Sequence, residues 1–214
     1  MRQRRASSGT TTSDGARAQY TSGALRWAAQ AAPAADQSTL RCQHLGRLLA
    51  ASRTGGDPHG LIVWNILCAI AAYKQRHPDR IYRSGGAAEF RLWLPGMVSG
   101  RNPDVAVVLR NTPKDYRGHR PPVLAFEVVS KRGEARDYQV KREEYLAFGL
   151  REYWIVDPLA RRVTVLIRDG DAWIERVFQG EQTAEGLVLP GFLLPLAELW
   201  TDEEPGDDSL EAHD

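Results

Sequence analysis

The stretch RNPDVAVVL, residues 101–109, places a turn-forming Asn-Pro pair directly before a run of β-branched residues. Asn and Pro favour turns, whereas a short run rich in valine is typical of a buried strand. We therefore expect Asp104 to lie at the beginning of a strand. An aspartate after a proline is commonly a turn or cap residue, so this position alone does not define a site.

A second carboxylate lies inside an apolar run, VLAFEVV at residues 123–129. Strand alternation places Glu127 on a face whose other members are apolar, which predicts a buried carboxylate. Burial of an ionised carboxylate requires a cation, an ion pair or a shifted pKa to compensate for lost hydration. A metal ion would do this, and an arginine such as Arg91 or Arg110 is the alternative partner.

The segment that follows, residues 137–149, is rich in helix formers and ends in Gly149, which suits a helix C-cap. Asp137, Lys141 and Tyr145 recur every four residues and share one face of the predicted helix. Lys141 could thus point toward the buried glutamate, with Asp137 and Tyr145 holding it in place. A solvated ion pair on the helix surface is the alternative interpretation.

In this order the motifs resemble the putative restriction endonuclease family of the PD-(D/E)XK nuclease superfamily. The resemblance spans about residues 59–200 and also includes HG at 59–60, REYWIVDP at 151–158 and LPGF at 189–192. The superfamily pattern places a lysine two positions after the second acid, where this chain has Val129. The resemblance therefore nominates Lys141 on the following helix, with Lys131 as the competing candidate.

The resemblance implies an α/β fold with a restriction endonuclease-like core, in which helices flank a central mixed β-sheet and extra β-hairpins follow toward the C-terminus. It also implies a metal-dependent endonuclease that hydrolyses DNA. Asp104, Glu127 and the backbone carbonyl of Val128 would hold Mg²⁺ or Mn²⁺, and Lys141 would assist the attack of water. DNA and a second copy of the chain are the expected partners.

Two other functions are compatible with the same residues. The chain could be a nucleic-acid-binding or regulatory module that cleaves poorly, in which case binding would survive the loss of Glu127. It could also be a structural domain in which Asp104, Glu127 and Lys141 form a buried ion network. Removal of Glu127 would then destabilise the fold without affecting any nucleic acid.

Composition divides the 214 residues into three parts. Residues 1–57 are predicted to be disordered or divergent, residues 58–200 to form one domain, and residues 201–214 to form an acidic disordered tail. The net charge of +1 indicates no charged partner for the whole chain. Residues 110–142, however, hold nine Lys or Arg and four acidic residues, which would favour a phosphate backbone near the proposed site.

The remaining elements are predicted from apolar periodicity. A buried helix is expected over residues 59–73, and it is too short to span a bilayer. Strands are expected over residues 80–84, 89–94, 153–156, 163–167 and 173–178. The tryptophans at 154 and 173 are predicted to be core or subunit contacts rather than base-stacking platforms. No apolar signal-peptide core follows the N-terminus, so we expect a cytoplasmic protein without a membrane partner.

Overall fold

The computed structural model describes residues 58–94, 100–130, 133 and 136–200. Its elements are α2 (Pro58–Arg76), β1 (Ile81–Gly86), β2 (Val105–Leu109), β3 (Leu124–Val128), a π-helix η2 (Arg136–Val140), α3 (Lys141–Phe148), β4 (Glu152–Asp157), β5 (Arg162–Asp169), β6 (Ala172–Gln179), β7 (Thr183–Glu185), β8 (Leu193–Pro195) and α4 (Leu196–Leu199). The predicted N-terminal segment, the acidic tail and Lys131 lie outside the described residues.

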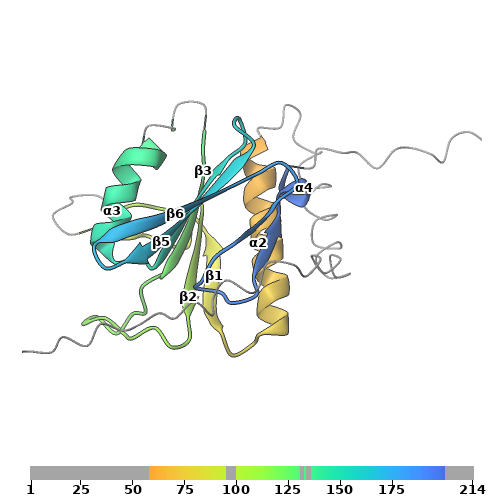
Figure 1. The fold of residues 1–214 in the computed structure, drawn as a ribbon. Helices are drawn as coiled ribbons and strands as arrows, with labels where there is room; N and C mark the ends of the chain where they lie inside the picture. The colour runs from red at the N-terminus through yellow and green to blue at the C-terminus, as the bar shows by residue number, and fades with distance from the viewer. Residues whose placement is uncertain (1–57, 95–99, 131–132, 134–135, 201–214) are drawn as a thin grey trace, which may run out of the picture. The chain divides into compact units, whose positions relative to one another are not determined.

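Six strands form one mixed sheet in the order β1-β2-β3-β4-β5-β6 (Figure 1). All neighbouring pairs are antiparallel except β3 and β4, which run parallel with Glu127 opposite Ile155. A parallel pair requires a crossover connection, and here η2 and α3 provide it. The mixed sheet predicted for this chain is confirmed.

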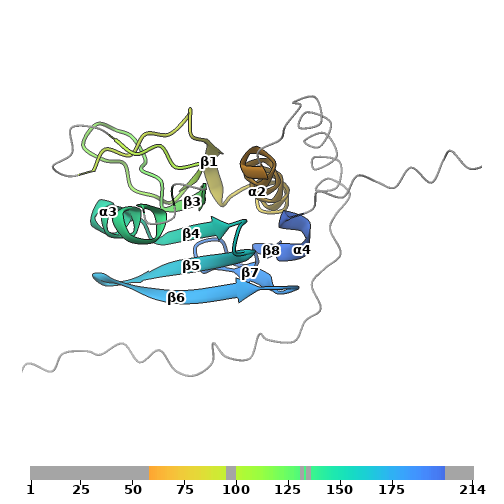
Figure 2. The same cartoon turned by 90° about the horizontal axis from the view of Figure 1, so that it is seen from above.

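The two faces of the sheet bury separate apolar clusters, because successive side chains of a strand point to opposite faces. On one face Phe126 and Trp154 pack with residues of α2 and of the C-terminal segment. On the other face Ala125 and Tyr153 pack with α3. Figure 2 shows α2 and α3 on opposite sides of the strands. The layers are therefore helix, sheet and helix, as predicted.

The strand predicted over residues 89–94 is not present. In its place the structure has an isolated bridge, in which Leu92 and Arg101 exchange main-chain hydrogen bonds of 2.7 and 2.8 Å. Phe90, Leu92 and Leu94 are buried, so the alternation of the sequence correctly marked the inward side chains. Alternation reports burial but does not require a continuous ladder, which explains the wrong prediction.

The helix after β3 begins with a π-turn rather than as one continuous α-helix. Residues Arg136–Val140 form η2, and α3 continues from Lys141 to Phe148. Gly149 then caps α3 with φ of 97°, a left-handed conformation that favours glycine, so the predicted C-cap is confirmed. Of the three residues predicted to share one helix face, Asp137 lies in η2, whereas Lys141 and Tyr145 lie in α3.

The C-terminal part of the domain adds hairpins, as predicted. β5 and β6 are joined at a tight turn in which Gly170 has φ of 60°, and β7 pairs antiparallel with β8. Trp154 is fully buried, which confirms its assignment to the core, and Trp173 is half-buried with its Nε1 donating to the carbonyl of Arg142 at 2.9 Å. Among the described residues, no helix is long and apolar enough to cross a membrane.

Candidate active site

Asp104 and Glu127 meet because β2 and β3 are antiparallel neighbours. Val105 lies opposite Phe126, so the residue before β2 comes next to the last residues of β3. The main-chain N–H of Val128 donates to Asp104 Oδ2 at 2.8 Å, and the main-chain N–H of Asp104 approaches Glu127 Oε2 at 3.4 Å. The two carboxylates predicted from the sequence thus share one end of the sheet.

Glu127 is 2% exposed and lies among apolar and aromatic side chains. Its Oε1 accepts a hydrogen bond from the Tyr145 hydroxyl, and its Oε2 lies 3.0 Å from Lys141 Nζ. Burial raises the pKa of Glu127 to about 7, with the Asp104 carboxylate adding to the rise and Lys141 opposing it. A further cation near this carboxylate would therefore be bound favourably.

Lys141 contacts one carboxylate of the sheet, Glu127, and one of the preceding helical turn, Asp137. Its Nζ lies 2.6 Å from Asp137 Oδ1 and 3.0 Å from Glu127 Oε2, and its side chain is 16% exposed. Burial lowers the pKa of Lys141, but Glu127 and Asp137 outweigh it and raise the pKa above its usual value. Lys141 is consequently an ammonium in the site as it stands.

The π-turn and a glycine place Asp137 beneath this ammonium. The main-chain N–H of Asp137 donates to the carbonyl of Gly133 at 2.9 Å. A Cβ atom added at Gly133 would lie 2.8 Å from Ser130 Oγ and 3.2 Å from Asp137 Oδ2. The buried Tyr153 hydroxyl donates to the Asp137 carbonyl at 3.1 Å. Single-turn π-helices occur frequently at functional sites, and this one positions Asp137.

His59 is a member of the site whose role the sequence did not reveal. Its Nε2 lies 3.2 Å from Asp104 Oδ2, from the first turn of α2. Burial raises the pKa of Asp104, but the hydrogen bonds from His59 and from Val128 N–H outweigh it and hold the pKa below its usual value. The only sequence signal was its place in the HG pair that opens the helix.

An ion pair holds the segment that precedes Asp104 against α3. Arg101 Nε and Nη2 donate to the two carboxylate oxygens of Glu144, each at 2.6 Å. This two-point geometry is the strong form of an arginine–carboxylate contact. It joins the segment before β2 to α3, and so it fixes the carboxylate of the sheet relative to the lysine of the helix.

The structure settles one open alternative. Glu127 pairs with Lys141 and Tyr145, whereas Arg110 donates to the carbonyl of Pro78 at 3.0 Å and Arg91 stacks over the ring of Trp93. The interpretation of Glu127 as the partner of an arginine is therefore wrong.

The donor set of the site fits a hard divalent cation. Within the described ranges, no group of three or more His, Cys, Asp or Glu side chains is arranged to hold a metal ion. Two adjacent carboxylates are nevertheless present, and burial, together with the neighbouring Asp104 carboxylate, raises the pKa of Glu127 despite the ammonium of Lys141. Mg²⁺ commonly binds through one or two carboxylates and completes its shell with water and phosphate oxygens.

The sheet order, the crossover helix and the acid pair at the ends of β2 and β3 define a protein of the restriction endonuclease-like class. A solved structure described as a putative nuclease from Anabaena variabilis has the same fold, with a TM-score of 0.54 and 15% identity over 69% of this chain and 83% of that one. Residues 30–197 match the putative restriction endonuclease family, and the chain belongs to that family. The comparison with curated proteins gave no match.

Proposed function

We propose that the chain is a metal-dependent endonuclease that hydrolyses phosphodiester bonds in DNA. The observation that carries the proposal is the convergence of Asp104, Glu127 and Lys141 at one end of the sheet. Membership of the putative restriction endonuclease family supports a nuclease, and the basic residues of segment 110–142 support a polyanionic substrate.

In this proposal Asp104, Glu127 and the backbone carbonyl of Val128 hold Mg²⁺ or Mn²⁺, since all three offer hard oxygen ligands. Bound there, the cation would polarise the scissile phosphate and acidify a water molecule. His59 and the N–H of Val128 keep the Asp104 carboxylate ionised and oriented. Tyr145 orients Glu127 in the same way, as burial raises the pKa of the phenol and keeps it a hydrogen-bond donor.

Lys141 acts in this scheme as a fixed positive charge. Its raised pKa disfavours proton abstraction from water by its amine. The ammonium is instead suited to stabilise the charge that develops on the phosphoryl oxygens, because preorganised donors act strongly where water is excluded. Asp137 and Glu127 hold it in position before the substrate arrives.

Metal binding is expected to depend on pH through Glu127. A carboxyl with a pKa of about 7 is mainly protonated at lower pH, and the proton competes with the cation. We expect the affinity for Mn²⁺, measured by calorimetry, to rise about tenfold between about pH 6 and about pH 8 and then to level off. An affinity that is flat over this range, or that falls as pH rises, would contradict the assignment of Glu127 as a ligand.

Cleavage of supercoiled plasmid and of single-stranded DNA by the purified chain tests the proposed function. We expect nicking with Mg²⁺ or Mn²⁺, none with a chelator, and loss of nicking in Asp104→Asn. The matched control is Glu181→Gln, which removes an exposed carboxylate on the turn after β6 and should leave the rate unchanged. Equal nicking by wild type and Asp104→Asn would contradict the proposal that this carboxylate belongs to the active site.

The competing account is a structural ion network, which is favoured by the contacts of Lys141 with two carboxylates. It predicts a folded protein that leaves every nucleic acid intact and binds no metal. A homodimer and a cytoplasmic location also stay predictions. Sedimentation of the full chain, with and without DNA, tests the dimer.

A further inference from the structure

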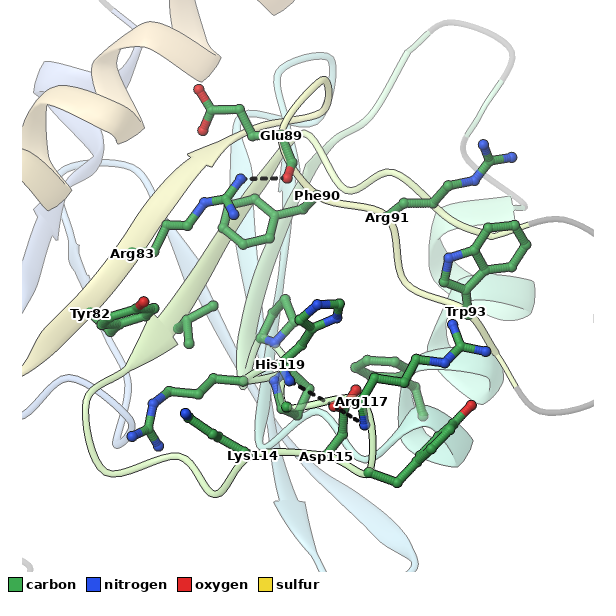
Figure 3. Close-up of a pocket in the computed structure, with 17 residues that line it drawn as sticks. Tyr82, Arg83, Glu89, Phe90, Arg91, Trp93, Lys114, Asp115, Arg117 and His119 are labelled. Atoms are coloured by element: carbon green, nitrogen blue, oxygen red, sulfur yellow. Dashed lines mark hydrogen bonds between the residues drawn. The ribbon is translucent and has the colours of Figure 1, made fainter.

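A pocket that does not include the acid pair lies beyond the C-terminal end of α3. It is a pocket of about 620 Å³ between the turn at residues 114–122 and the segment at residues 89–93 that follows β1 (Figure 3). Val108 of β2 and Phe148 of α3 also line it. The size is in the range of pockets that bind small ligands or single nucleotides.

The charge of the lining is strongly positive. Five Lys or Arg side chains line the pocket with two acidic ones; the basic ones are Arg83, Arg91, Lys114, Arg117 and Arg120. The Asp115 carboxylate is occupied within its own turn, where Oδ1 accepts the N–H groups of Arg117 and His119 at 2.9 and 2.8 Å. The Glu89 carboxylate points away from the basic side chains (Figure 3) and lies against Gly85. The pocket therefore suits an anionic ligand.

Three aromatic rings of the lining are unusually exposed. The exposed fractions are 54% for Tyr82, 53% for Trp93 and 88% for Tyr116. Each ring carries a guanidinium over its face, at 5.9 Å for Arg120 over Tyr82, 4.8 Å for Arg91 over Trp93 and 5.1 Å for Arg117 over Tyr116. Arginine on an aromatic ring combines a positive charge for phosphate with flat surfaces for stacking.

Exposed rings interleaved with cations match the chemistry of an unpaired nucleic-acid strand. Bases of a single strand present their faces for stacking on aromatic side chains, and their phosphates pair with basic groups. Bases within a duplex are already stacked on one another, and a duplex is read mainly through groove edges and phosphates. A concave pocket with several exposed rings is therefore better suited to an unpaired segment than to a duplex.

The pocket and the acid pair are joined by the same elements. Lys141, Tyr145 and Phe148 share a face of α3 at helical spacing, so the helix runs from the active site to the pocket over about 10 Å. The segment with Arg91 and Trp93 is paired with the segment before Asp104 through the Leu92–Arg101 bridge. A separation of about 10 Å corresponds to at most about three nucleotide steps, because an unpaired strand spans at least the rise of about 3.4 Å per nucleotide of a duplex.

We propose that this pocket holds unpaired nucleotides of a DNA strand whose scissile phosphate lies a few nucleotides away at Asp104 and Glu127. The inference rests on the proposed function for the phosphate that is cleaved, but the binding of the strand is a separate property. Trp93 and Tyr116 provide stacking surfaces, and Arg91 and Arg117 contact phosphates. The chain is then a nuclease for DNA that contains a single-stranded segment.

Binding of a fluorescent oligothymidylate of about twelve nucleotides, a length within the site size of single-strand binders, tests this proposal. Anisotropy is measured with the full chain in a chelator, so that no cleavage occurs. Trp93→Ala and Tyr116→Ala are each expected to weaken binding by about 5- to 100-fold, as loss of a stacking partner does elsewhere. Trp93→Phe, which keeps a ring, should retain most of the affinity.

The controls lie on β6, at the other edge of the sheet. Ile174→Ala removes an exposed apolar side chain, and Arg176→Ala removes one positive charge. At a fixed salt concentration, neither substitution should change the affinity for the oligomer by more than about twofold. Arg117→Ala should also reduce the salt dependence of binding, by about 0.7 in logarithmic slope for each phosphate that the protein no longer neutralises. A blunt duplex of the same sequence should bind more weakly and respond less to the two aromatic substitutions.

Several results would overturn the proposal. One such result is that the pocket variants bind the oligomer like wild type. Another is that the same substitutions weaken binding to the duplex to the same extent as binding to the oligomer. A third is that a uridylate oligomer of the same length binds about tenfold more tightly than the oligothymidylate. Failure of the proposed function looks different, because oligomer binding would still depend on the pocket while no DNA is cleaved with any metal. If the chain cleaves DNA but its pocket variants bind the oligomer normally, the proposed function holds and the pocket has no part in it.

Discussion

Replacing Lys141 by methionine is expected to lower the single-turnover rate of DNA cleavage by about 10²- to 10³-fold. This is the range found when an enzyme loses one preorganised donor that stabilises the transition state. Methionine keeps a long unbranched side chain while it removes the ammonium that contacts Glu127 and Asp137 at 3.0 and 2.6 Å. Arginine at this position should recover little activity, since its planar fork does not match a site built for a point charge.

The matched control for this substitution is the next residue along α3. Arg142→Met removes a cation whose partner is Glu175 at 2.7 Å, in a contact that is exposed on both sides. Exposed pairs contribute little, so this variant should cleave within about twofold of wild type. Similar losses in the two variants would mean that the charge of the helix, rather than the position of Lys141, matters.

A structural role for Lys141 can be separated from a catalytic one. Its charge opposes the rise in the pKa of Glu127, so Lys141→Met should shift the pH midpoint of Mn²⁺ binding upward. Thermal unfolding shows whether the variant is folded at the assay temperature. A folded Lys141→Met protein that cleaves like wild type would contradict the role proposed for this residue.

Replacing Glu152 by alanine is expected to produce the largest loss of stability, at roughly 3 kcal/mol. Glu152 is buried at the beginning of β4, far along the strand from the acid pair. Its carboxylate accepts three hydrogen bonds, from Trp154 Nε1 at 2.7 Å, Leu187 N–H at 2.6 Å and Val188 N–H at 2.9 Å. Alanine would leave these three donors buried without a partner.

This carboxylate attaches the segment before β8 to the sheet, and Gly186 allows the close approach. A Cβ at Gly186 would collide with the Glu152 carboxylate, so Gly186→Ala should destabilise the fold by disturbing the same hydrogen bonds. The melting temperature of Glu152→Ala should fall by roughly 6 to 12 °C, at about 2 to 4 °C for each kcal/mol in a domain of this size.

The control for Glu152 is Glu185, two residues before Leu187. Its carboxylate pairs with Arg176 at 2.9 Å in an exposed contact, and Glu185→Ala should cost less than about 1 kcal/mol. Cleavage by Glu152→Ala below its melting temperature should match that of wild type, because no member of the acid pair contacts it. A loss of less than about 1 kcal/mol in Glu152→Ala would contradict the attachment role.

The main features of the fold and the site could be predicted because they depend on local patterns. Alternation in β3 marked Glu127 as buried, and four-residue spacing placed Lys141 near it. Gly149 signalled the end of α3 because a left-handed cap favours glycine. These signals use only neighbours along the chain, and so the sequence contains them in full.

The features that escaped prediction depend on partners far away in sequence. His59 reaches Asp104 across 45 positions, and Glu152 binds N–H groups 35 and 36 positions later. The π-turn depends on the hydroxyl of Tyr153 and on Gly133, which no periodicity indicates. The basic residues before β3 were visible in the sequence, but their stacking on exposed rings required the folded chain.

The most direct test of the central claim, that Asp104 and Glu127 form a divalent-cation site, is to measure Mn²⁺ binding by electron paramagnetic resonance. At about pH 8, where the Glu127 carboxyl with its pKa of about 7 is mainly ionised, we expect one bound Mn²⁺ per chain. Asp104→Asn and Glu127→Gln should each abolish the binding of this Mn²⁺ ion, and Glu181→Gln should retain it. A wild-type chain that binds no Mn²⁺, or an Asp104→Asn variant that binds it equally well, would contradict the claim.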